Sequence, residues 1–221
     1  MFRPKYITFD CYGTLTNFRM SQMTREVFPD RVAPDRMEAF VRDFAAYRLD
    51  EAMGDWKPYQ DVIRQALQRT CRRWQIEYRD EEAKRMYAAV PTWGPHPDVA
   101  EPLTRIARHI PLVILSNASN DQIHHNVAKL GAPFHAVFTA EQAQAYKPRL
   151  QAFEYMLGQL GCGPEDILHV SSSPRYDLMS ANDLGIRNKA YVARGHEPPP
   201  AAAYSAQEIK DIRGLPALVG L

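Results

Sequence analysis

The sequence is poor in cysteine, in long apolar runs and in excess charge of either sign. Its three cysteines, Cys11, Cys71 and Cys162, lie far apart and form no CxxC pair, so they indicate neither a disulfide framework nor a zinc site. No stretch approaches the roughly 20 apolar residues of a membrane span, and the N-terminal segment lacks the apolar region of a secretory signal. We therefore expect a cytoplasmic protein without a membrane partner.

The charges of the chain nearly balance. The 27 basic and 26 acidic residues give a net charge of +1, and no run of lysines and arginines forms the basic patch that a phosphate backbone would require. We expect no nucleic acid partner. With 221 residues, of which 45% are hydrophobic, the chain can bury the core of one α/β domain and a smaller insert.

Strand-like and helical segments alternate in the second half of the chain. Apolar segments at 5–10, 111–115, 135–139, 166–170 and 189–193 have the length of buried strands. Helical segments lie between them; one begins at Asp98 as its cap, and others end at Gly131, Gly161 and Gly185. This alternation predicts an α/β fold with a Rossmann-like, doubly wound parallel sheet, whose ligands bind beyond the carboxyl ends of the strands.

Residues 16–91 have a helical periodicity instead. Apolar side chains recur three and four residues apart, in one stripe within 37–45 and in another within 62–67. The sequence thus predicts a catalytic core of residues 1–15 and 92–221, with a helical cap domain of residues 16–91 inserted after the first strand.

Polar residues follow the predicted strands at the points where these end. They are Asp10 and Thr14, Ser116 and Asn117, Lys147, and Ser171 to Ser173 with Asp177. Each group alone could simply cap a turn or a helix. Because the carboxyl ends of parallel strands meet at one edge of a sheet, we expect all four groups to converge on one crevice.

In the order of these motifs and of the helical insert along the chain, the sequence resembles the haloacid dehalogenase superfamily, and within it the type II, or L-2-haloacid, dehalogenases. The resemblance rests on the segments FDCYGTL at 9–15, LSN at 115–117, YKP at 146–148 and VSSS at 170–173 with Asp177, and on the helical insert. It implies a hydrolytic dehalogenase of short-chain 2-haloacids that needs no metal and no cofactor. It leaves a homodimer open as the assembly.

Residue 12 favours the dehalogenases over the phosphatases of the superfamily. The phosphatases carry a second aspartate two residues after the nucleophile, because an alkoxide leaving group needs a proton; here Tyr12 stands there, and a halide leaves without a proton. The phosphatases also hold Mg²⁺ with an acidic residue of the fourth motif, where this chain has serines. Two alternatives stay open: a Mg²⁺-dependent small-molecule phosphatase, and a binding member of the fold without turnover.

The resemblance also implies roles for individual residues. Asp10 attacks the halogen-bearing C2 and forms an ester that water then hydrolyses. Lys147 is expected to lower the pKa of Asp10 by favouring its charged form, and Asp177 to position or activate the hydrolytic water. The expected hydrogen-bond partners of Asp10 or of the substrate carboxylate are Thr14, Ser116, Ser171 and Ser173.

The leaving halide needs a positive charge, which the family supplies by an arginine of the first cap helix. On a helix with about 100° per residue, Arg48 projects near the centre of the face formed by the apolar residues of 37–45, and Arg42 projects well away from it. Arg42, however, matches the family arginine better in its position relative to neighbouring residues. We favour Arg48 and leave Arg42 open. Asn117 and Tyr176 are expected to complete the halide site.

Two further features concern the substrate pocket. Tyr12 is expected to line the apolar pocket for the alkyl part of the substrate. Between Val170 and Asp177 the fourth motif has one residue more than the best-known family members, which leaves open which serine contacts the substrate.

Overall fold

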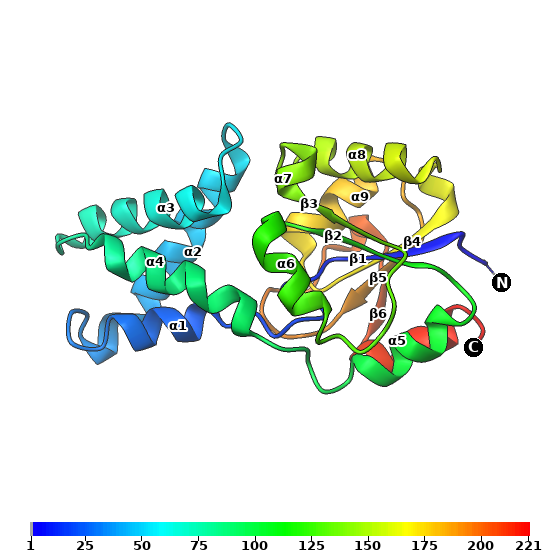
Figure 1. Cartoon of the computed structure of the whole chain (residues 1–221), viewed down its shortest axis with the longest axis horizontal. Helices are drawn as coiled ribbons and strands as arrows, with labels where there is room; N and C mark the ends of the chain where they lie inside the picture. Colours follow the sequence, from blue (N-terminus) through cyan, green and yellow to red (C-terminus); the bar gives the residue numbers. More distant parts are fainter. Residues whose placement is uncertain (1) are drawn as a thin grey trace. The chain divides into compact units, whose positions relative to one another are not determined.

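The computed structural model describes residues 2–221, which fold into two compact units (Figure 1). The core unit comprises the residues up to Asn17 together with Gly94–Leu221, and the helical unit comprises Phe18–Trp93. Both boundaries lie two residues further along the chain than the predicted ones. The chain thus leaves the core unit after its first strand and returns to it before the second.

The core unit contains one parallel sheet. Within the described residues it has six strands in the order β3-β2-β1-β4-β5-β6. They are β1 (Tyr6–Phe9), β2 (Leu112–Ser116), β3 (Ala136–Thr139), β4 (Ile167–Ser171), β5 (Lys189–Val192) and β6 (Gln207–Ile209). The predicted parallel sheet is confirmed, with β6 in addition. Two of the three residues of β6 are exposed, so its sequence carries little of the apolar pattern that identifies a strand.

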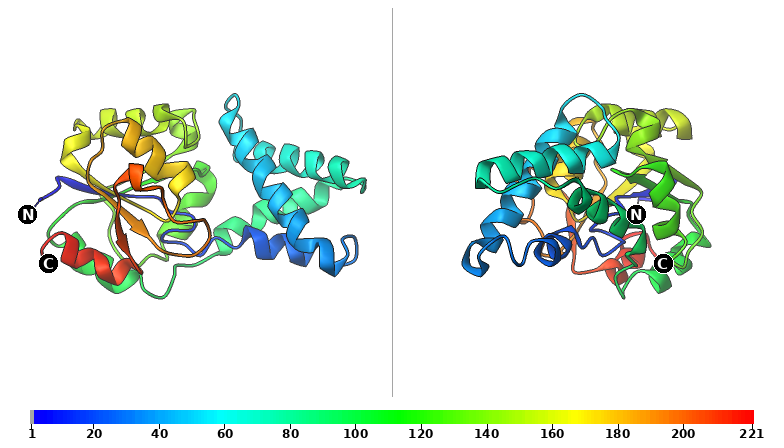
Figure 2. Two further views of the ribbon diagram at one scale, coloured as in Figure 1. Left: turned by 180° about the vertical axis from the view of Figure 1, so that it is seen from behind. Right: turned by 60° about the vertical axis from the view of Figure 1, so that its left-hand side comes forward.

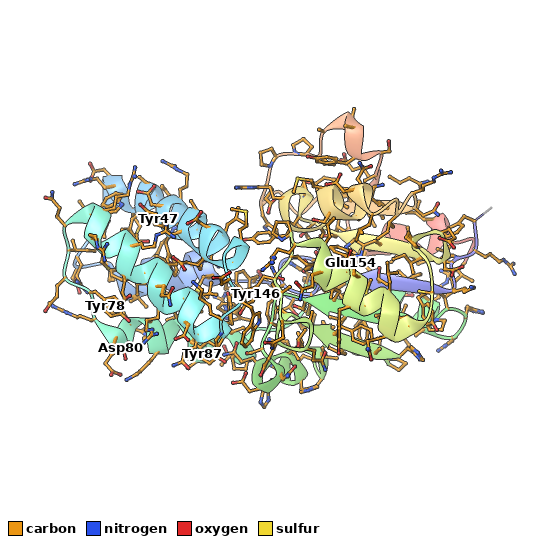
Figure 3. The ribbon with its side chains drawn as sticks, turned by 90° about the horizontal axis from the view of Figure 1, so that it is seen from above. Tyr47, Tyr78, Asp80, Tyr87, Tyr146 and Glu154 are labelled. Atoms are coloured by element: carbon orange, nitrogen blue, oxygen red, sulfur yellow. The ribbon has the colours of Figure 1, made fainter. Side chains whose placement is uncertain are left out.

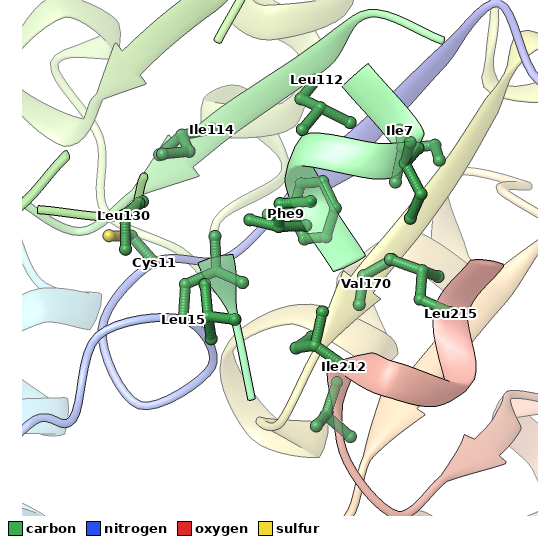
Figure 4. Packing of buried hydrophobic residues seen from close by; sticks show 14 of the residues in the cluster. Ile7, Phe9, Cys11, Leu15, Leu112, Ile114, Leu130, Val170, Ile212 and Leu215 are labelled. Atoms are coloured by element: carbon green, nitrogen blue, oxygen red, sulfur yellow. The ribbon is translucent and has the colours of Figure 1, made fainter. Parts of the chain in front are cut away.

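Helices cover both faces of this sheet (Figures 1 and 2). One face packs against α5 (Ala100–Ala107), α6 (Asn120–Val127) and α10 (Leu215–Leu218), and the other against α7 (Ala140–Ala143), α8 (Leu150–Leu160) and α9 (Met179–Asp183). Phe9, Ile114 and Val170 point into the first layer (Figure 4). Neighbouring strand residues such as Val113 and Ile167 point into the second. Burial on both faces explains why these strands are continuous apolar runs.

Short helical turns connect the main elements of the core unit. They are the 3₁₀ turns Pro164–Asp166, Ala202–Tyr204 and Ile212–Gly214 and the π-helical turn Pro174–Leu178. The prediction that Asp98 caps α5 is wrong, because α5 begins at Ala100 and Val99 precedes it as the cap residue. The Asp98 carboxylate instead accepts hydrogen bonds from Arg194 at 2.7 and 2.9 Å and from the Ile212 N–H at 2.8 Å. The arginine offers a bidentate, charge-assisted pair that a single helix N–H cannot match.

The helical unit is built from α1 (Met20–Val27), α2 (Met37–Met53), α3 (Tyr59–Trp74) and α4 (Asp80–Ala89), with 3₁₀ turns at Pro34–Arg36 and Val90–Thr92. Its core combines aliphatic and aromatic side chains, and the ring centroids of Phe28 and Phe40 lie 4.8 Å apart. At its surface the Tyr78 hydroxyl donates to Asp80 at 2.8 Å (Figure 3). No helix among residues 2–221 combines the length and apolarity needed to cross a membrane.

Candidate active site

Asp10 stands at the carboxyl end of the central strand β1. Its N–H donates to Val170 O at 3.1 Å, which continues the sheet pairing for one residue. Its buried carboxylate is held at both oxygens: Thr14 Oγ1 donates to Oδ2 at 2.7 Å, and Lys147 Nζ donates to Oδ1 at 2.9 Å. The carboxylate is therefore fixed in one orientation at the edge of the sheet.

Lys147 reaches this edge from the loop after α7. The Asn117 amide brackets its backbone, since Oδ1 accepts from Lys147 N at 2.7 Å and Nδ2 donates to Lys147 O at 2.8 Å. The buried ammonium binds three oxygens: Asp10 Oδ1, Asp177 Oδ1 at 2.8 Å and Leu115 O at 2.8 Å. All three of its protons are used. Sequence reasoning did not foresee that Asn117 anchors the lysine loop; its part in halide binding stays a prediction.

The fourth motif contains the π-helical turn Pro174–Leu178 between β4 and α9. The helix predicted to end at Gly185 is α9, which begins only at Met179, after this turn. A π turn contains one residue more than an α turn, so it provides room for the additional residue that the resemblance implies for this motif. Asp177 thereby still reaches Lys147.

The hydroxyl groups expected at the site have different partners. Ser172 binds Thr14 Oγ1 through its N–H at 2.9 Å and its Oγ at 3.1 Å, and Ser171 Oγ accepts from Ser173 N at 2.9 Å. Ser173 Oγ accepts from the Tyr176 N–H, and it donates to Glu197 at 2.8 Å rather than to Asp10. Ser116 Oγ is buried and has no hydrogen-bond partner among residues 2–221; its part in substrate binding stays a prediction.

The two carboxylates that share Lys147 differ in acidity. Burial raises the pKa of Asp10, and the charge of Asp177 adds to this although Lys147 and Thr14 oppose it. Burial alone would also raise the pKa of Asp177, yet Lys147 and the hydrogen bond from His169 bring it below its ordinary value. The predicted effect of Lys147, which lowers the pKa of Asp10 by favouring its charged form, is present, but burial and the charge of Asp177 outweigh it and the net shift is upward. One ammonium divided between two buried carboxylates cannot offset the desolvation of both.

Residues that follow β5 bind the loop after Asp10. His196 Nε2 donates to Gly13 O at 3.0 Å, and Arg194 donates to Thr14 O at 2.9 and 3.2 Å. His96 Nε2 reaches the same Gly13 oxygen at 3.3 Å. Sequence reasoning missed these residues and Glu197. Arg194, His196 and Glu197 are polar residues that follow a predicted strand, so the rule that identified the other four groups applies to them as well. His96 follows no predicted strand.

Several predicted site residues lie elsewhere or have other contacts. Tyr12 donates its hydroxyl to Asn126 on α6 at 3.0 Å. In the helical unit Arg42 is exposed, whereas Arg48 is half-buried with its guanidinium 5.0 Å from the Phe44 ring centroid. The Nε of Arg48 is buried and has no hydrogen-bond partner within the described residues. The roles given to these residues and to Tyr176 in substrate and halide binding stay predictions.

The charge distribution at Asp10 opposes the binding of Mg²⁺. The Lys147 ammonium binds Oδ1 of both Asp10 and Asp177, so a hard dication held by these two carboxylates would lie beside an existing positive charge. In the part of the chain that the structure describes, no group of three His, Cys, Asp or Glu residues could hold a metal ion.

Comparisons with known proteins point to one family. A family model for haloacid dehalogenase-like hydrolases matches residues 4–185. Haloacetate dehalogenase H-2 of Moraxella sp. (strain B) is 28% identical over 183 residues, 81% of each chain. The (S)-2-haloacid dehalogenase of Xanthobacter autotrophicus is 28% identical over 197 residues, 86% of this chain and 75% of that protein. A solved L-2-haloacid dehalogenase of X. autotrophicus with covalently bound chloropropionic acid has the same fold, with a TM-score of 0.79 at 23% identity over 98% of both chains. Since the family model spans most of the sequence, the chain belongs to the haloacid dehalogenase-like hydrolases.

Proposed function

We propose that this protein is a metal-independent hydrolase that removes the halogen from short-chain 2-haloacids, with Asp10 as the nucleophile. Its relatives in Moraxella and Xanthobacter are named haloacetate and (S)-2-haloacid dehalogenases. The observation that carries the proposal is the buried Asp10 carboxylate, held by Lys147 and Thr14, with a tyrosine at position 12 where a phosphatase needs its acid. Such a site suits a leaving group that departs without a proton.

In the first step Asp10 attacks C2 of the substrate in line with the carbon–halogen bond. A carboxylate oxygen forms the new C–O bond, the halide leaves with the bonding electron pair, and the configuration at C2 inverts. Burial, which raises the pKa of Asp10, also removes water from the carboxylate and leaves its ionised form more nucleophilic. Ser116 Oγ, which has no partner among the described residues, is suited to bind the substrate carboxylate.

In the second step water attacks the carbonyl carbon of the Asp10 ester. The ester oxygen leaves with the substrate carbon, so the product is a 2-hydroxy acid and the Asp10 carboxyl is regenerated. Asp177 is the candidate to receive the proton of this water, because its lowered pKa keeps it ionised.

The proposal is tested by measuring halide release from (S)-2-chloropropionate in the presence of EDTA. We expect turnover to (R)-2-hydroxypropionate without added metal, and an Asp10 ester that intact-mass spectrometry detects after rapid quenching. Asp10→Asn should release no halide, whereas Asp61→Asn, which removes a surface carboxylate paired with Arg64, should behave like the wild type.

Three outcomes would contradict the proposal. Halide release by Asp10→Asn would exclude this nucleophile. If the wild type instead releases only phosphate from phosphate esters, and only with Mg²⁺, the phosphatase alternative is correct. Absence of both activities would indicate a binding member of the family.

A further inference from the structure

Strand β4 carries a buried histidine that no role in the proposed reaction has yet used. His169 is fully buried, and its Nε2 lies 3.0 Å from Asp177 Oδ1 while its Nδ1 lies 2.8 Å from Thr8 Oγ1. Its ring meets Phe153 of α8 nearly edge-on, with centroids 5.1 Å apart. A polar ring inside an otherwise apolar parallel strand is costly unless it is hydrogen-bonded. An apolar side chain could fill this position without that cost.

The direction of the hydrogen bond to Asp177 follows from the chemistry of the two groups. The ionised Asp177 carboxylate has no proton to give, so His169 Nε2 must carry the proton and donate it. Lys147 Nζ donates to the same oxygen at 2.8 Å. Asp177 Oδ1 thus accepts two hydrogen bonds from donors on two different elements.

The other oxygen of Asp177 has a different environment. Oδ2 is buried, and no group among residues 2–221 donates a hydrogen bond to it. A buried carboxylate oxygen without a donor is unfavourable unless a ligand or water completes it. Because Asp10 and Asp177 bind the same ammonium, the open oxygen belongs to a carboxylate adjacent to the nucleophile.

We propose that His169 is a positioning residue for the hydrolytic step, an inference that rests on the proposed function. Together with Lys147 it fixes the Asp177 carboxylate through Oδ1, which keeps Oδ2 free to accept a proton from water. Without the second donor the carboxylate can rotate and present either oxygen to Lys147, so that its open oxygen no longer has one fixed position.

The step that His169 supports is balanced as follows. The water oxygen bonds to Cγ of the Asp10 ester, and its proton passes to Asp177 Oδ2. The bond between Cγ and the ester oxygen then breaks, and the departing 2-hydroxy acid takes the proton from Asp177. Asp10 is left as a carboxylic acid, which loses its proton to solvent. Halide departure precedes all of this and does not involve Asp177 as a base.

Comparing the rates of halide release and ester hydrolysis therefore distinguishes the two roles of His169: loss of a positioning residue slows ester hydrolysis alone, whereas loss of a purely structural residue affects both steps. His169→Phe keeps an aromatic ring against Phe153 but removes the donor to Asp177, whereas His169→Gln keeps an amide donor. Thr8→Val is the matched control, because it removes the Nδ1 partner of the histidine and leaves the Nε2 donor in place. Each variant is mixed with (S)-2-chloropropionate in a rapid-quench experiment that follows halide and the ester mass.

We expect His169→Phe to release one equivalent of halide at nearly the wild-type rate and then to hydrolyse the ester about 10- to 100-fold more slowly. The ester should accumulate, kcat should fall with little change in the rate of the first halide burst, and His169→Gln should recover most of the hydrolysis rate. Thr8→Val should stay within about threefold of the wild type.

The proposal is overturned if His169→Phe slows both steps equally, if it leaves ester hydrolysis unchanged, or if His169→Gln is as slow as His169→Phe. Should His169→Phe fail to fold, His169→Leu, which also lacks the donor to Asp177, takes its place: ester hydrolysis as fast in His169→Leu as in Thr8→Val rejects the role. If the wild type itself releases no halide, the proposed function fails, and the role of His169 fails with it. A wild type that forms and hydrolyses the ester limits any failure to His169.

Discussion

Replacing Lys147 by methionine tests the electrostatic arrangement of the site. Lys147 is the positive charge within hydrogen-bond distance of both Asp10 and Asp177, and all three side chains are buried. Methionine has a similar length and no charge, so it fills the space but leaves two buried carboxylates side by side. We expect Lys147→Met to lower the free energy of unfolding at neutral pH and to abolish halide release.

The magnitude follows from the loss of one partner of a buried ion pair. Removing a single member costs about 3–5 kcal/mol, because the remaining charge stays buried without compensation. In the variant the pKa of both carboxyl groups rises in the folded state, so the folded protein binds protons more readily than the unfolded chain. In the wild type Asp177 has a lowered pKa, and the stability that it contributes is lost as the pH falls. The difference between the two proteins should therefore be largest at neutral pH and shrink toward pH of about 4.

Urea unfolding followed by circular dichroism at several pH values measures this difference. Lys189→Met is the matched control, since Lys189 is also buried but donates to the Ile186 carbonyl at 2.6 Å instead of to a carboxylate. Loss of that hydrogen bond should cost about 1 kcal/mol. Its effect should not change in the range where carboxyl groups titrate.

Either of two results would refute this reasoning. Wild-type stability of Lys147→Met at neutral pH would mean that the three groups do not form a coupled ion pair. A destabilisation that stays constant from pH 7 to about pH 4, or that equals that of Lys189→Met, would assign the effect to packing alone.

Three further predictions concern individual groups of the site. Burial and the charge of Asp177 raise the pKa of Asp10 from its ordinary value of 3.8, so the rate of the halide burst should fall on acidification at a pH above 3.8. Asp177→Asn should move this fall in rate to lower pH, and an unchanged pH dependence would show that Asp177 does not act on Asp10. Ser116→Ala should leave the melting temperature unchanged, because the hydroxyl has no partner among the described residues. The same variant should raise KM for the haloacid about 10-fold or more, and an unchanged KM would show that Ser116 does not bind the substrate. Arg48→Gln should slow the halide burst about 100-fold while Arg42→Gln leaves it unchanged, and the reverse result would assign the halide to Arg42.

Much of the core fold follows from local patterns in the sequence. Apolar runs such as LVILS at 112–116 are buried on both faces of the sheet, and this burial is what makes their sequence continuous rather than alternating. The three-residue strand β6 escaped prediction because such a short, half-exposed segment has no distinctive period.

The rule that polar residues follow parallel strands also led to Asp10, Thr14, Lys147 and Asp177, whose side chains the structure brings into one hydrogen-bonded group. This worked because the direction of the strands alone determines that their carboxyl ends share an edge. Lys147 differs from the others in that it lies beyond α7, and the Asn117 amide holds its backbone at this edge.

Only the tertiary structure decided how these groups divide the hydrogen bonds and charges among them. That one ammonium serves two carboxylates, that Asn117 anchors the backbone of Lys147, and that His169 holds Asp177 depend on contacts between elements distant in sequence. A pKa is likewise set by burial and by the distance to every neighbouring charge. Sequence order places a residue on a strand and at its end, whereas the partners of its side chain depend on packing in three dimensions.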